Sequence, residues 1–337
     1  MRIAVTGSIA TDHLMSFPGR FSEAILGEHL ERISLSFLTE TLVVRPGGVA
    51  ANIALGLAWL GRAPVLVGAA GADFAEHRAA LEARGVDTRG VLVAEADFTA
   101  RFLCTTDRDQ NQIASFYPGA MRRAAEIRLA DVAARTGDFD LVLVGPNDPE
   151  AMLAHTRECR GGGVPFAADP SQQLARMDGP GLRELVGGAR YLFTNEYEHA
   201  LLNEKTGWDD EEVLARVGCW VTTCGPAGVR IQRAPDEPVT VPAVPPEPGS
   251  AGDPTGVGDG FRAGFLAGLA AGTGLEDAAR VGCALATLVL EADGPQEYQV
   301  DQDAFLGRIR AVYGAGAAAQ IAARVFPAVG PAAGLAS

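Results

Sequence analysis

The chain alternates short β-branched runs with longer stretches whose apolar residues recur at helical spacing. Strands that alternate with helices of this length are typical of a parallel sheet covered on both faces, so the sequence predicts an α/β fold. The predicted strands span Ile3–Thr6, Val65–Ala69, Leu141–Gly145, Pro165–Ala168, Tyr191–Thr194 and Trp220–Thr223. The predicted helices span Val49–Leu60, Asp73–Arg84, Pro149–Arg160, Glu196–Asn203 and Val257–Ala271.

Two regions depart from this alternation. Residues 31–45 alternate apolar and polar positions, which is typical of a half-exposed strand pair. Residues 99–117 do the same, with residues 107–111 as the hairpin turn. Together the two regions predict a small antiparallel sheet that projects from the main domain as a lid over a cleft. From about residue 315 the chain is rich in Ala, Gly and Pro, which predicts a frayed or loosely attached helix.

Charge and composition exclude several kinds of partner. The 337 residues carry a net charge of -14 without a basic run, so extended nucleic acid and anionic membranes are poor partners. No segment is apolar over the length of a membrane span, and the N-terminus lacks the apolar stretch of a signal peptide. The five cysteines show no CxxC spacing, which argues against a disulfide framework or a zinc site. We therefore expect a reduced, cytoplasmic protein with one large α/β domain or two smaller ones.

The stretch from residue 253 to 265 carries the strongest functional signal. Gly256 and Gly258 allow a tight turn whose backbone N–H groups face an anion at the positive end of the following helix. Asp259 follows at once, and a second negative charge is favourable there only if it does chemical work, such as accepting the proton of a hydroxyl that attacks a phosphoryl group. The helix N-terminus predicts a lowered pKa for this carboxyl. The alternative is a glycine-rich turn with Asp259 as a helix cap.

Two further motifs lie in the first sixth of the chain. Gly47 and Gly48 open a helix in which Asn52 lies one turn in, where backbone N–H groups and an amide side chain can hold sugar hydroxyls. Taken alone, this pattern is better explained by a loop and a solvated asparagine. Asp12 follows the first strand, at the end where parallel sheets bind ligands, and its carboxylate suits a vicinal diol. An ordinary turn or capping aspartate explains Asp12 equally well.

Three more features each allow a functional and a purely structural interpretation. Asn195 and Glu198 match a capping box, and Glu198 also suits the anchoring of magnesium and its waters. The glycine-rich segment 221–228 is either a simple turn or a cover for the phosphates or ribose of a nucleotide. Phe102 and Phe116 lie on the two arms of the lid hairpin, where they either form a small core or sandwich a flat base.

Together and in this order, the motifs resemble the ribokinase-like (phosphofructokinase-B, PfkB) family of carbohydrate and nucleoside kinases. The resemblance covers about residues 1–300 and is carried by Gly47-Gly48 with Asn52, Gly68–Asp73, Asn195 with Glu198, Thr223 with Gly225, and Thr255–Asp259. Val257 and Pro254 stand where the family often has Ala and Thr, a mild departure because backbone amides bind the anion. The resemblance implies a ribokinase-like three-layer αβα sandwich around a mostly parallel sheet, with a small antiparallel β lid.

The implied organisation is a kinase domain over residues 1–312, with lid segments at about 11–46 and 97–118, and an Ala/Gly-rich tail over 313–337. Within the family, the chain is most similar to the bacterial adenosine kinases, in segments 4–14, 114–120 and 168–174. That closer likeness implies a pocket for a nucleoside. It carries less weight than the family likeness, because related sugar kinases share much of this architecture.

The resemblance also implies a role for each motif. Asp259 is the implied base, and Gly256, Val257 and Gly258 form the implied anion hole. The residues implied to bind the substrate are Ser8, Asp12, Gly48, Asn52, Phe102, Phe116, Gln172 and Gln173, with Arg176 near the phosphates. The residues implied to contact the nucleotide are Asn195, Thr223, Gly225 and Gly228, and Glu198 is implied to hold the metal.

These roles imply an ATP- and Mg²⁺-dependent kinase that phosphorylates the 5′-hydroxyl of adenosine, a step of purine salvage. The alternative is a PfkB-family sugar kinase acting on ribose, fructose or a related sugar. A non-catalytic nucleoside-binding protein on this fold is a third interpretation, against which the intact Asp259 motif speaks. The open edge and apolar face of the lid predict a homodimer formed through it.

Overall fold

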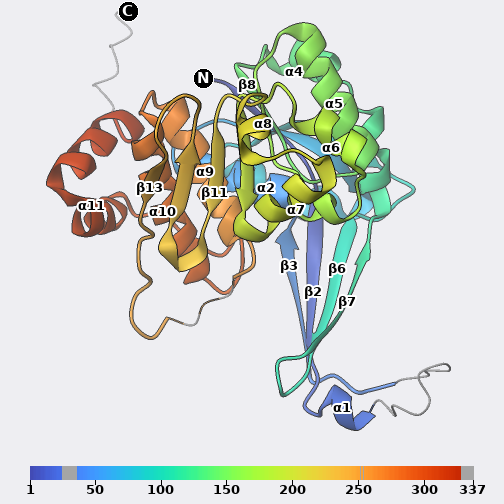
Figure 1. Cartoon of the computed structure of the whole chain (residues 1–337). Helices are drawn as coiled ribbons and strands as arrows, with labels where there is room; N and C mark the ends of the chain where they lie inside the picture. The colour runs from blue at the N-terminus through green and yellow to red at the C-terminus, as the bar shows by residue number, and fades with distance from the viewer. Residues whose placement is uncertain (25–35, 251, 253, 328–337) are drawn as a thin grey trace, which may run out of the picture.

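The structure is a computed structural model that describes residues 1–24, 36–250, 252 and 254–327. Within these residues the chain forms a nine-stranded sheet flanked by helices and a four-stranded sheet that projects from it (Figure 1). The order across the larger sheet is β13 (Val239–Val241), β12 (Val229–Gln232), β11 (Trp220–Thr223), β10 (Tyr191–Asn195), β9 (Phe166–Ala168), β8 (Leu141–Val144), β1 (Ile3–Thr6), β4 (Val65–Gly71) and β5 (Asp87–Ala94). The strands from β5 across to β11 run parallel, and β12 and β13 continue the sheet antiparallel.

Helices cover both faces of the larger sheet. One face carries α2 (Val49–Trp59), α3 (Ala75–Ala83), α9 (Val257–Ala270), α10 (Leu275–Leu290) and α11 (Gln302–Val325). The other face carries α4 (Leu129–Thr136), α5 (Pro149–Gly162), α6 (Gly179–Val186), α7 (Glu196–Thr206) and α8 (Asp210–Leu214). The face covered by α2, α3, α9, α10 and α11 encloses one hydrophobic core, here called the first core, and the face covered by α4 to α8 encloses the second core. Successive side chains of a strand point to opposite faces, so that in β1 Val5 packs into the first core and its neighbour Ala4 into the second.

The predicted αβα sandwich is confirmed. Every strand and helix predicted for the αβα sandwich is present, with its ends shifted by a few residues at most. Strands buried on both faces are continuous apolar runs, which explains why they are recognisable from the sequence. No helix in the described part of the chain is long and apolar enough to cross a membrane.

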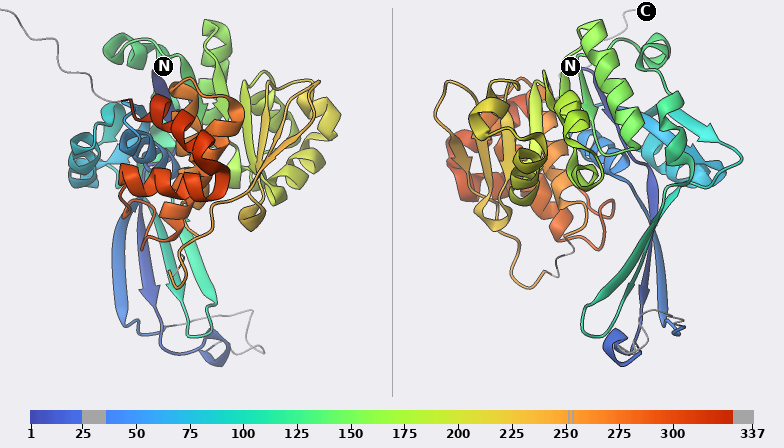
Figure 2. Two further views of the ribbon diagram at one scale, coloured as in Figure 1. Left: turned by 90° about the vertical axis from the view of Figure 1, so that its left-hand side faces the viewer. Right: turned by 45° about the vertical axis from the view of Figure 1, so that its right-hand side comes forward.

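The smaller sheet, here called the lid, consists of β3 (Thr41–Gly47), β2 (Ala10–Ser16), β6 (Ala100–Thr106) and β7 (Gln112–Tyr117), in that order. It extends away from the larger sheet, with α1 (Phe21–Ala24) near its far end (Figures 1 and 2). The predicted hairpin over residues 99–117 is confirmed, because β6 and β7 pair antiparallel across residues 107–111. The β2–β3 pair is also antiparallel, whereas the central pair, β2 and β6, runs parallel.

The strand pair predicted within residues 31–45 does not form as expected. Residues 31–35 lie outside the described part of the chain, and the rest of the pattern contributes the single strand β3. Its antiparallel partner is β2, which follows the first strand of the larger sheet almost directly. A period of two marks a half-exposed strand without saying which strand it pairs with, and this explains the error.

The C-terminal segment packs more tightly than its composition predicts. Helix α11 continues to Val325 with a kink at Gly314, and Ala318 and Ile321 are buried in the first core. The expected boundary at residue 312 therefore falls inside a helix that belongs to the main domain. The remainder of the expected tail, residues 328–337, lies outside the described residues.

Candidate active site

A cleft of ≈ 760 Å³ lies between the lid and the larger sheet. Its walls come from the lid, the first turns of α2 and α9, and the loops that follow β9, β10 and β11. These loops lie at the carboxyl end of a parallel sheet, where such sheets bind ligands. The lining residues are Ser8, Ala10, Asp12, Gly48, Val49, Asn52, Phe102, Phe116, Ser171, Gln172, Asn195, Glu196, Tyr197, Glu198, Thr223, Gly225, Thr255, Gly256, Gly258, Asp259 and Arg262.

Most of the residues singled out from the sequence come together in this cleft. The ones that line it are Ser8, Asp12, Gly48, Asn52, Phe102, Phe116, Gln172, Asn195, Glu198, Thr223, Gly225, Gly256, Gly258 and Asp259. Four expected residues are not among the lining side chains: Gln173, Arg176, Val257 and Gly228. Of these, Val257 was expected to act through its backbone, and its side chain packs against the first core.

The other three lie away from the cleft for structural reasons. Gln173 is buried, and its Nε2 donates to the backbone oxygen of Asn147 at 2.7 Å, so its amide braces a loop. Arg176 ends the short 3₁₀ turn after β9 with an exposed side chain. Gly228 closes the turn between β11 and β12 at a φ of 98°, where a Cβ would lie 2.1 Å from the oxygen of Val241. Sequence patterns of alternation and turns predict where such residues lie along the chain, but they do not predict the direction in which the side chains point.

The first turn of α9 forms the floor of the cleft. Gly256 caps this helix with φ 78°, and a Cβ there would lie 2.5 Å from the Cβ of Pro295, so only glycine fits. The first amides of a helix have no acceptor within the helix, and the helix dipole adds positive potential at this end. These amides and the glycine next to them, Gly258, make the floor suitable for a phosphate.

Asp259 lies in this first turn and faces Asn52 of α2. Its Oδ2 accepts a hydrogen bond of 2.8 Å from Nδ2 of Asn52. Burial raises the pKa of the Asp259 carboxyl to about 7, and the Asn52 hydrogen bond and the charge of Arg262 oppose this rise. The lowered pKa expected from the helix dipole is therefore wrong, because desolvation outweighs the dipole at this position.

Arg262 was not identified from the sequence, although it lies one turn after Asp259 on the same helix. It is buried, and its Nη2 donates to Oδ1 of Asp169 at 2.7 Å, while Nε lies 2.6 Å from Oδ2. The same Nη2 lies 4.0 Å from Oε2 of Glu198. A Cβ on Gly258 would lie 2.7 Å from Nη1 of Arg262, so the guanidinium lies beside a residue of the expected anion site. The spacing of Asp259 and Arg262 on one helix face was the available signal.

The first turn of α2 faces the same cleft. Gly48 caps it at φ 97°, where a Cβ would lie 2.6 Å from the backbone oxygen of Ser8. The hydroxyl of Ser8 accepts from the backbone N–H of Val49 at 3.0 Å and so closes the helix start. The carboxylate of Asp12 lies over Gly47, because a Cβ there would lie 2.7 Å from its Oδ2.

Phe102 and Phe116 are neighbours across the lid hairpin. They are directly opposite each other on β6 and β7, and Asp12 is opposite Phe102 on β2. Residues opposite each other in a sheet point to the same side, so the three side chains form one row across the lid above the cleft. Both rings therefore lie on the side of the lid that faces the cleft, and Phe116 is 45% exposed.

Asn195 and Glu198 form the capping box expected at the start of α7. Asn195 Oδ1 accepts from the Glu198 amide at 2.8 Å, and Glu198 Oε2 accepts from the Asn195 amide at 2.8 Å. Both residues also line the cleft. The described residues contain no group of three or more metal-binding side chains. A lone carboxylate at Glu198 fits the outer shell of a hydrated magnesium ion rather than a site made of protein ligands.

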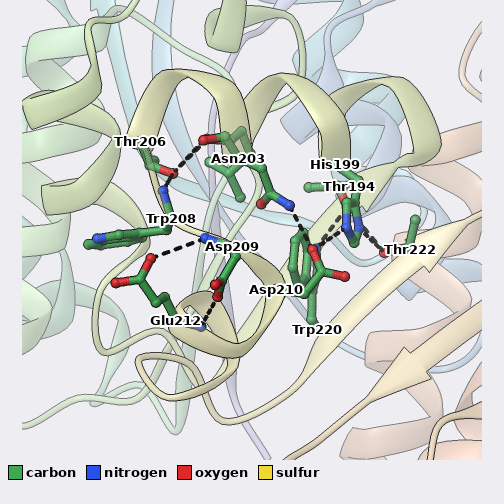
Figure 3. Close-up of polar contacts among 11 residues, drawn as sticks. Thr194, His199, Asn203, Thr206, Trp208, Asp209, Asp210, Glu212, Trp220 and Thr222 are labelled. Carbon is green, nitrogen blue, oxygen red and sulfur yellow. Dashed lines mark hydrogen bonds and ion pairs between the residues drawn. The ribbon is translucent and has the colours of Figure 1, made fainter.

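Beyond this capping box, a network of side chains joins α7 to α8, β10 and β11 (Figure 3). His199 stacks on Trp220 with ring centroids 3.8 Å apart, and its Nε2 lies 2.8 Å from Oδ1 of Asp210. Trp220 Nε1 donates to the hydroxyl of Thr194 at 2.9 Å. The network connects α7 and α8 to the ends of β10 and β11, and it thereby positions the adjacent residues Asn195 and Thr223.

Comparison with known proteins decides the family. A model of pfkB family carbohydrate kinases matches residues 12–302. The chain belongs to the PfkB family. A nucleoside kinase of Methanothermobacter thermautotrophicus is 31% identical over 271 residues, which cover 80% of this chain and 85% of that protein. Ribokinase of Bacillus subtilis is 27% identical over 300 residues, which cover 87% of this chain and 94% of that enzyme.

Solved structures support the same family and its fold. A nucleoside kinase of Burkholderia thailandensis in complex with inosine is similar with a TM-score of 0.81 and 36% identity, covering 93% of this chain and 98% of that one. The same enzyme in complex with ADP-inosine gives a TM-score of 0.79. The expected ribokinase-like fold is thus confirmed. The chain is a PfkB-family kinase, a phosphotransferase with an alcohol group as acceptor, acting on a nucleoside or a sugar.

The raised pKa of Asp259 makes the stability of the protein depend on pH. Because the pKa is about 7 in the folded chain and 3.8 ordinarily, the folded state binds this proton more tightly than the unfolded state between these values. The resulting stabilisation is complete below pH 3.8, is still partly present at pH 5, and is lost once the pH has risen through 7. Asp259→Asn keeps the shape without the charge and should raise the melting temperature at pH 8 by about 2 °C or more beyond its effect at pH 5.

Thermal unfolding followed by circular dichroism at both pH values measures this difference. Asp138→Asn is the matched control, since it removes the same charge from an exposed position. Equal effects of Asp259→Asn at pH 5 and pH 8 would contradict the raised pKa.

Proposed function

We propose that the protein transfers the γ-phosphate of ATP to the 5′-hydroxyl of adenosine. The observation that carries the proposal is Asp259, a carboxylate with a pKa near neutrality in the first turn of α9, beside amides suited to a phosphate. A base with a pKa near the working pH is effective at accepting a proton from an alcohol. The likeness to a nucleoside kinase that has been solved with ADP-inosine supports both the nucleotide and the nucleoside.

The nucleoside would lie beneath the lid. The row formed by Phe102 and Phe116 offers an apolar surface on which one face of a purine can stack. Asp12, in the same row, can accept hydrogen bonds from the ribose diol. Asn52 holds Asp259 with one amide hydrogen and carries a second one for a ribose hydroxyl. Gln172, which lines the cleft, is the amide that can reach the purine edge.

The reaction is an in-line displacement. The 5′-oxygen forms a bond to the γ-phosphorus as the bond from that phosphorus to the bridging oxygen of ADP breaks, and Asp259 takes the hydroxyl proton. The amides of the α9 start, with Arg262 beside them, stabilise the charge on the transferring group. Mg²⁺ bound with ATP supplies charge neutralisation on the phosphates. Glu198 can hold waters of that ion, and the loop with Thr223 and Gly225 can contact the nucleotide.

A sugar kinase is the second candidate, and the likeness to ribokinase of Bacillus subtilis favours it. Its substrate would use Asp12 and Asn52 in the same way but would leave the aromatic row of the lid without a partner. Phe116 is 45% exposed, and an aromatic surface aimed at a cleft has more to bind in a nucleoside than in a sugar. We therefore favour the nucleoside.

Replacing Asp259 tests the catalytic proposal. Asp259→Asn removes the proton acceptor and keeps the hydrogen bond from Asn52, so adenosine affinity measured by calorimetry should change only a few-fold. The turnover rate measured by ADP release should fall about 100-fold or more, the usual scale for loss of a general base. Asp138→Asn should leave turnover unchanged. A near-normal rate in Asp259→Asn would refute the assignment of the base.

A substrate panel tests the acceptor. Adenosine should exceed ribose and fructose in kcat/KM by about 1000-fold or more, because the sugars leave the aromatic row and Gln172 unpaired. Inosine and cytidine belong in the panel as competing nucleosides. Phe102→Ala should remove most of the advantage, since a stacked base contributes about 1–3 kcal/mol. Leu103→Ala, on the opposite face of the same strand, is the control. Comparable values for adenosine and a hexose would favour the sugar kinase.

The outer face of the lid supports a homodimer. Leu42, Val44, Ile113 and Tyr117 are 60%, 53%, 43% and 38% exposed on the side opposite Asp12, and β3 and β7 are open edges in the described sheet. A second copy of this chain would cover both the apolar face and an edge. Light scattering at micromolar concentration should give the mass of a dimer, and Val44→Glu should reduce it to a monomer. A monomer mass for the unmodified protein would refute this interface.

A further inference from the structure

A chain of three side-chain hydrogen bonds leads from the cleft into the body of the protein. Asn52 Nδ2 donates to Asp259 Oδ2 at 2.8 Å, and Gln296 Nε2 donates to Asn52 Oδ1 at 2.8 Å. At the far end, Nε2 of His77 lies 3.1 Å from Oε1 of Gln296. His77 comes from α3, Gln296 from the loop after α10, Asn52 from α2 and Asp259 from α9, so four separate segments meet in one line.

The carboxylate at one end determines the direction of every bond. An ionised Asp259 can only accept, so Asn52 must turn its NH₂ group toward it and its oxygen toward Gln296. That oxygen in turn requires the NH₂ group of Gln296, which leaves the Gln296 oxygen facing His77. His77 must then carry its proton on Nε2. Each side chain donates toward Asp259, and bonds aligned in this way strengthen one another.

The environment of His77 requires the same direction independently. The ring is buried, and its Nδ1 has no hydrogen-bond partner among the described residues. Burial lowers the pKa of His77 to about 4, so the ring is neutral and holds one proton. That proton belongs on Nε2, where the Gln296 oxygen accepts it, and not on Nδ1, where nothing does. The bond direction that His77 requires is therefore the same as the direction that the Asp259 carboxylate requires at the other end of the hydrogen-bond chain.

We propose that His77 and Gln296 are positioning residues for phosphoryl transfer, which lock the Asn52 amide with its NH₂ group toward Asp259. A free Asn52 amide can rotate by 180° and present its oxygen to the carboxylate, which would repel the ionised form and turn the base away. The lock prevents this rotation, although neither His77 nor Gln296 lines the cleft. The inference rests on the proposed role of Asp259 as the proton acceptor.

Other groups around Asp259 act on it independently of this chain. Arg262 on α9 favours the ionised carboxylate, whereas Asp169 after β9 and Asp12 on β2 oppose ionisation. Tyr298, in the same loop as Gln296, is buried near Asp259 and stays protonated, since burial raises the pKa of its hydroxyl. A variant at His77 or Gln296 leaves these four groups in place, so any change in the pH profile reports on the hydrogen-bond chain.

Gln296→Glu is the sharpest test, because it keeps the size of the side chain and reverses one bond. An ionised carboxylate at position 296 cannot donate to the Asn52 oxygen. If the Asn52 amide keeps its orientation, its oxygen faces this carboxylate; if the amide rotates, its oxygen faces Asp259. One of the two contacts is therefore repulsive in either orientation. At pH 8 kcat should fall about tenfold or more, while KM for ATP changes little. At pH 6 the loss should be smaller, since the introduced carboxyl group can be protonated and then donates as glutamine does. Deletion of a merely structural contact would give a loss independent of pH.

His77 provides a pair of variants. His77→Leu removes the donor, so kcat should fall and the ascending limb of the profile of kcat/KM against pH should move up by about 0.5–1 unit. His77→Gln places an amide N–H near the position of Nε2 and should restore both values. His155→Leu is the control, because His155 is also buried, lies on α5 at the opposite face of the larger sheet, and bonds the backbone oxygen of Ile127. It should lower the melting temperature without moving the pH profile.

The outcomes separate the two proposals. If Asp259→Asn retains its turnover, the proposed role of Asp259 fails. If Asp259→Asn loses turnover but Gln296→Glu and His77→Leu keep kcat and the pH profile of the unmodified protein, only the positioning role fails. Equal losses in His77→Leu and His77→Gln would also overturn it, because the donor would then not matter. Should His77→Leu fail to fold, Gln296→Glu and His77→Gln decide alone.

Discussion

The hydrogen bond between Asn52 and Asp259 is the contact on which the rest of the cleft depends. It joins the first turns of α2 and α9, from residues 207 positions apart in the chain. The helices approach closely because the residues at their crossing are small: a Cβ on Gly56 would lie 2.6 Å from the Cβ of Ala263. This crossing brings two positive helix ends to one place, so that the dipoles of both favour an anion there. At the α2 start, the amides of Val49 and Ala50 already donate to Ser8.

The same contact moderates the electrostatics of a buried carboxylate. Desolvation raises the pKa of Asp259, the Asn52 hydrogen bond and the charge of Arg262 oppose this rise, and the resulting pKa is about 7. Arg262 can remain charged in the interior because Asp169 pairs with one edge of its guanidinium, at Nη2 and Nε. Burial, an amide and a paired cation thus produce a group that neither a solvated aspartate nor an isolated helix start would give.

The fold and most of the cleft could be predicted from local patterns, because a short contiguous stretch of sequence is enough to identify a strand buried on both faces or a glycine-rich helix start. Gly256 and Asp259 are next to the helix that they begin, and Asp12 follows β1 closely. No local pattern identifies which residues from distant parts of the chain will contact each other. The pairing of β3 with β2, the inward turn of Gln173 and the link from His77 to Asp259 depend on segments that only folding brings together. The direction of the Asp259 pKa was missed for the same reason, since desolvation depends on what packs around the side chain.

The negative charge of the cleft limits which groups can attract the phosphates of a nucleotide. The chain has a net charge of -14, and among the described lining residues Arg262 is the cation, facing the carboxylates Asp12, Glu196, Glu198 and Asp259. Arg262 is already paired with Asp169, so the pair adds little net charge. In the proposed reaction, attraction for the phosphates would then come from backbone amides, whose dipoles are fixed, and from a divalent cation bound with the nucleotide. On the proposed reaction, the surplus of carboxylates favours a nucleotide bound with its metal over a bare triphosphate, which makes the metal the main counter-charge in the cleft.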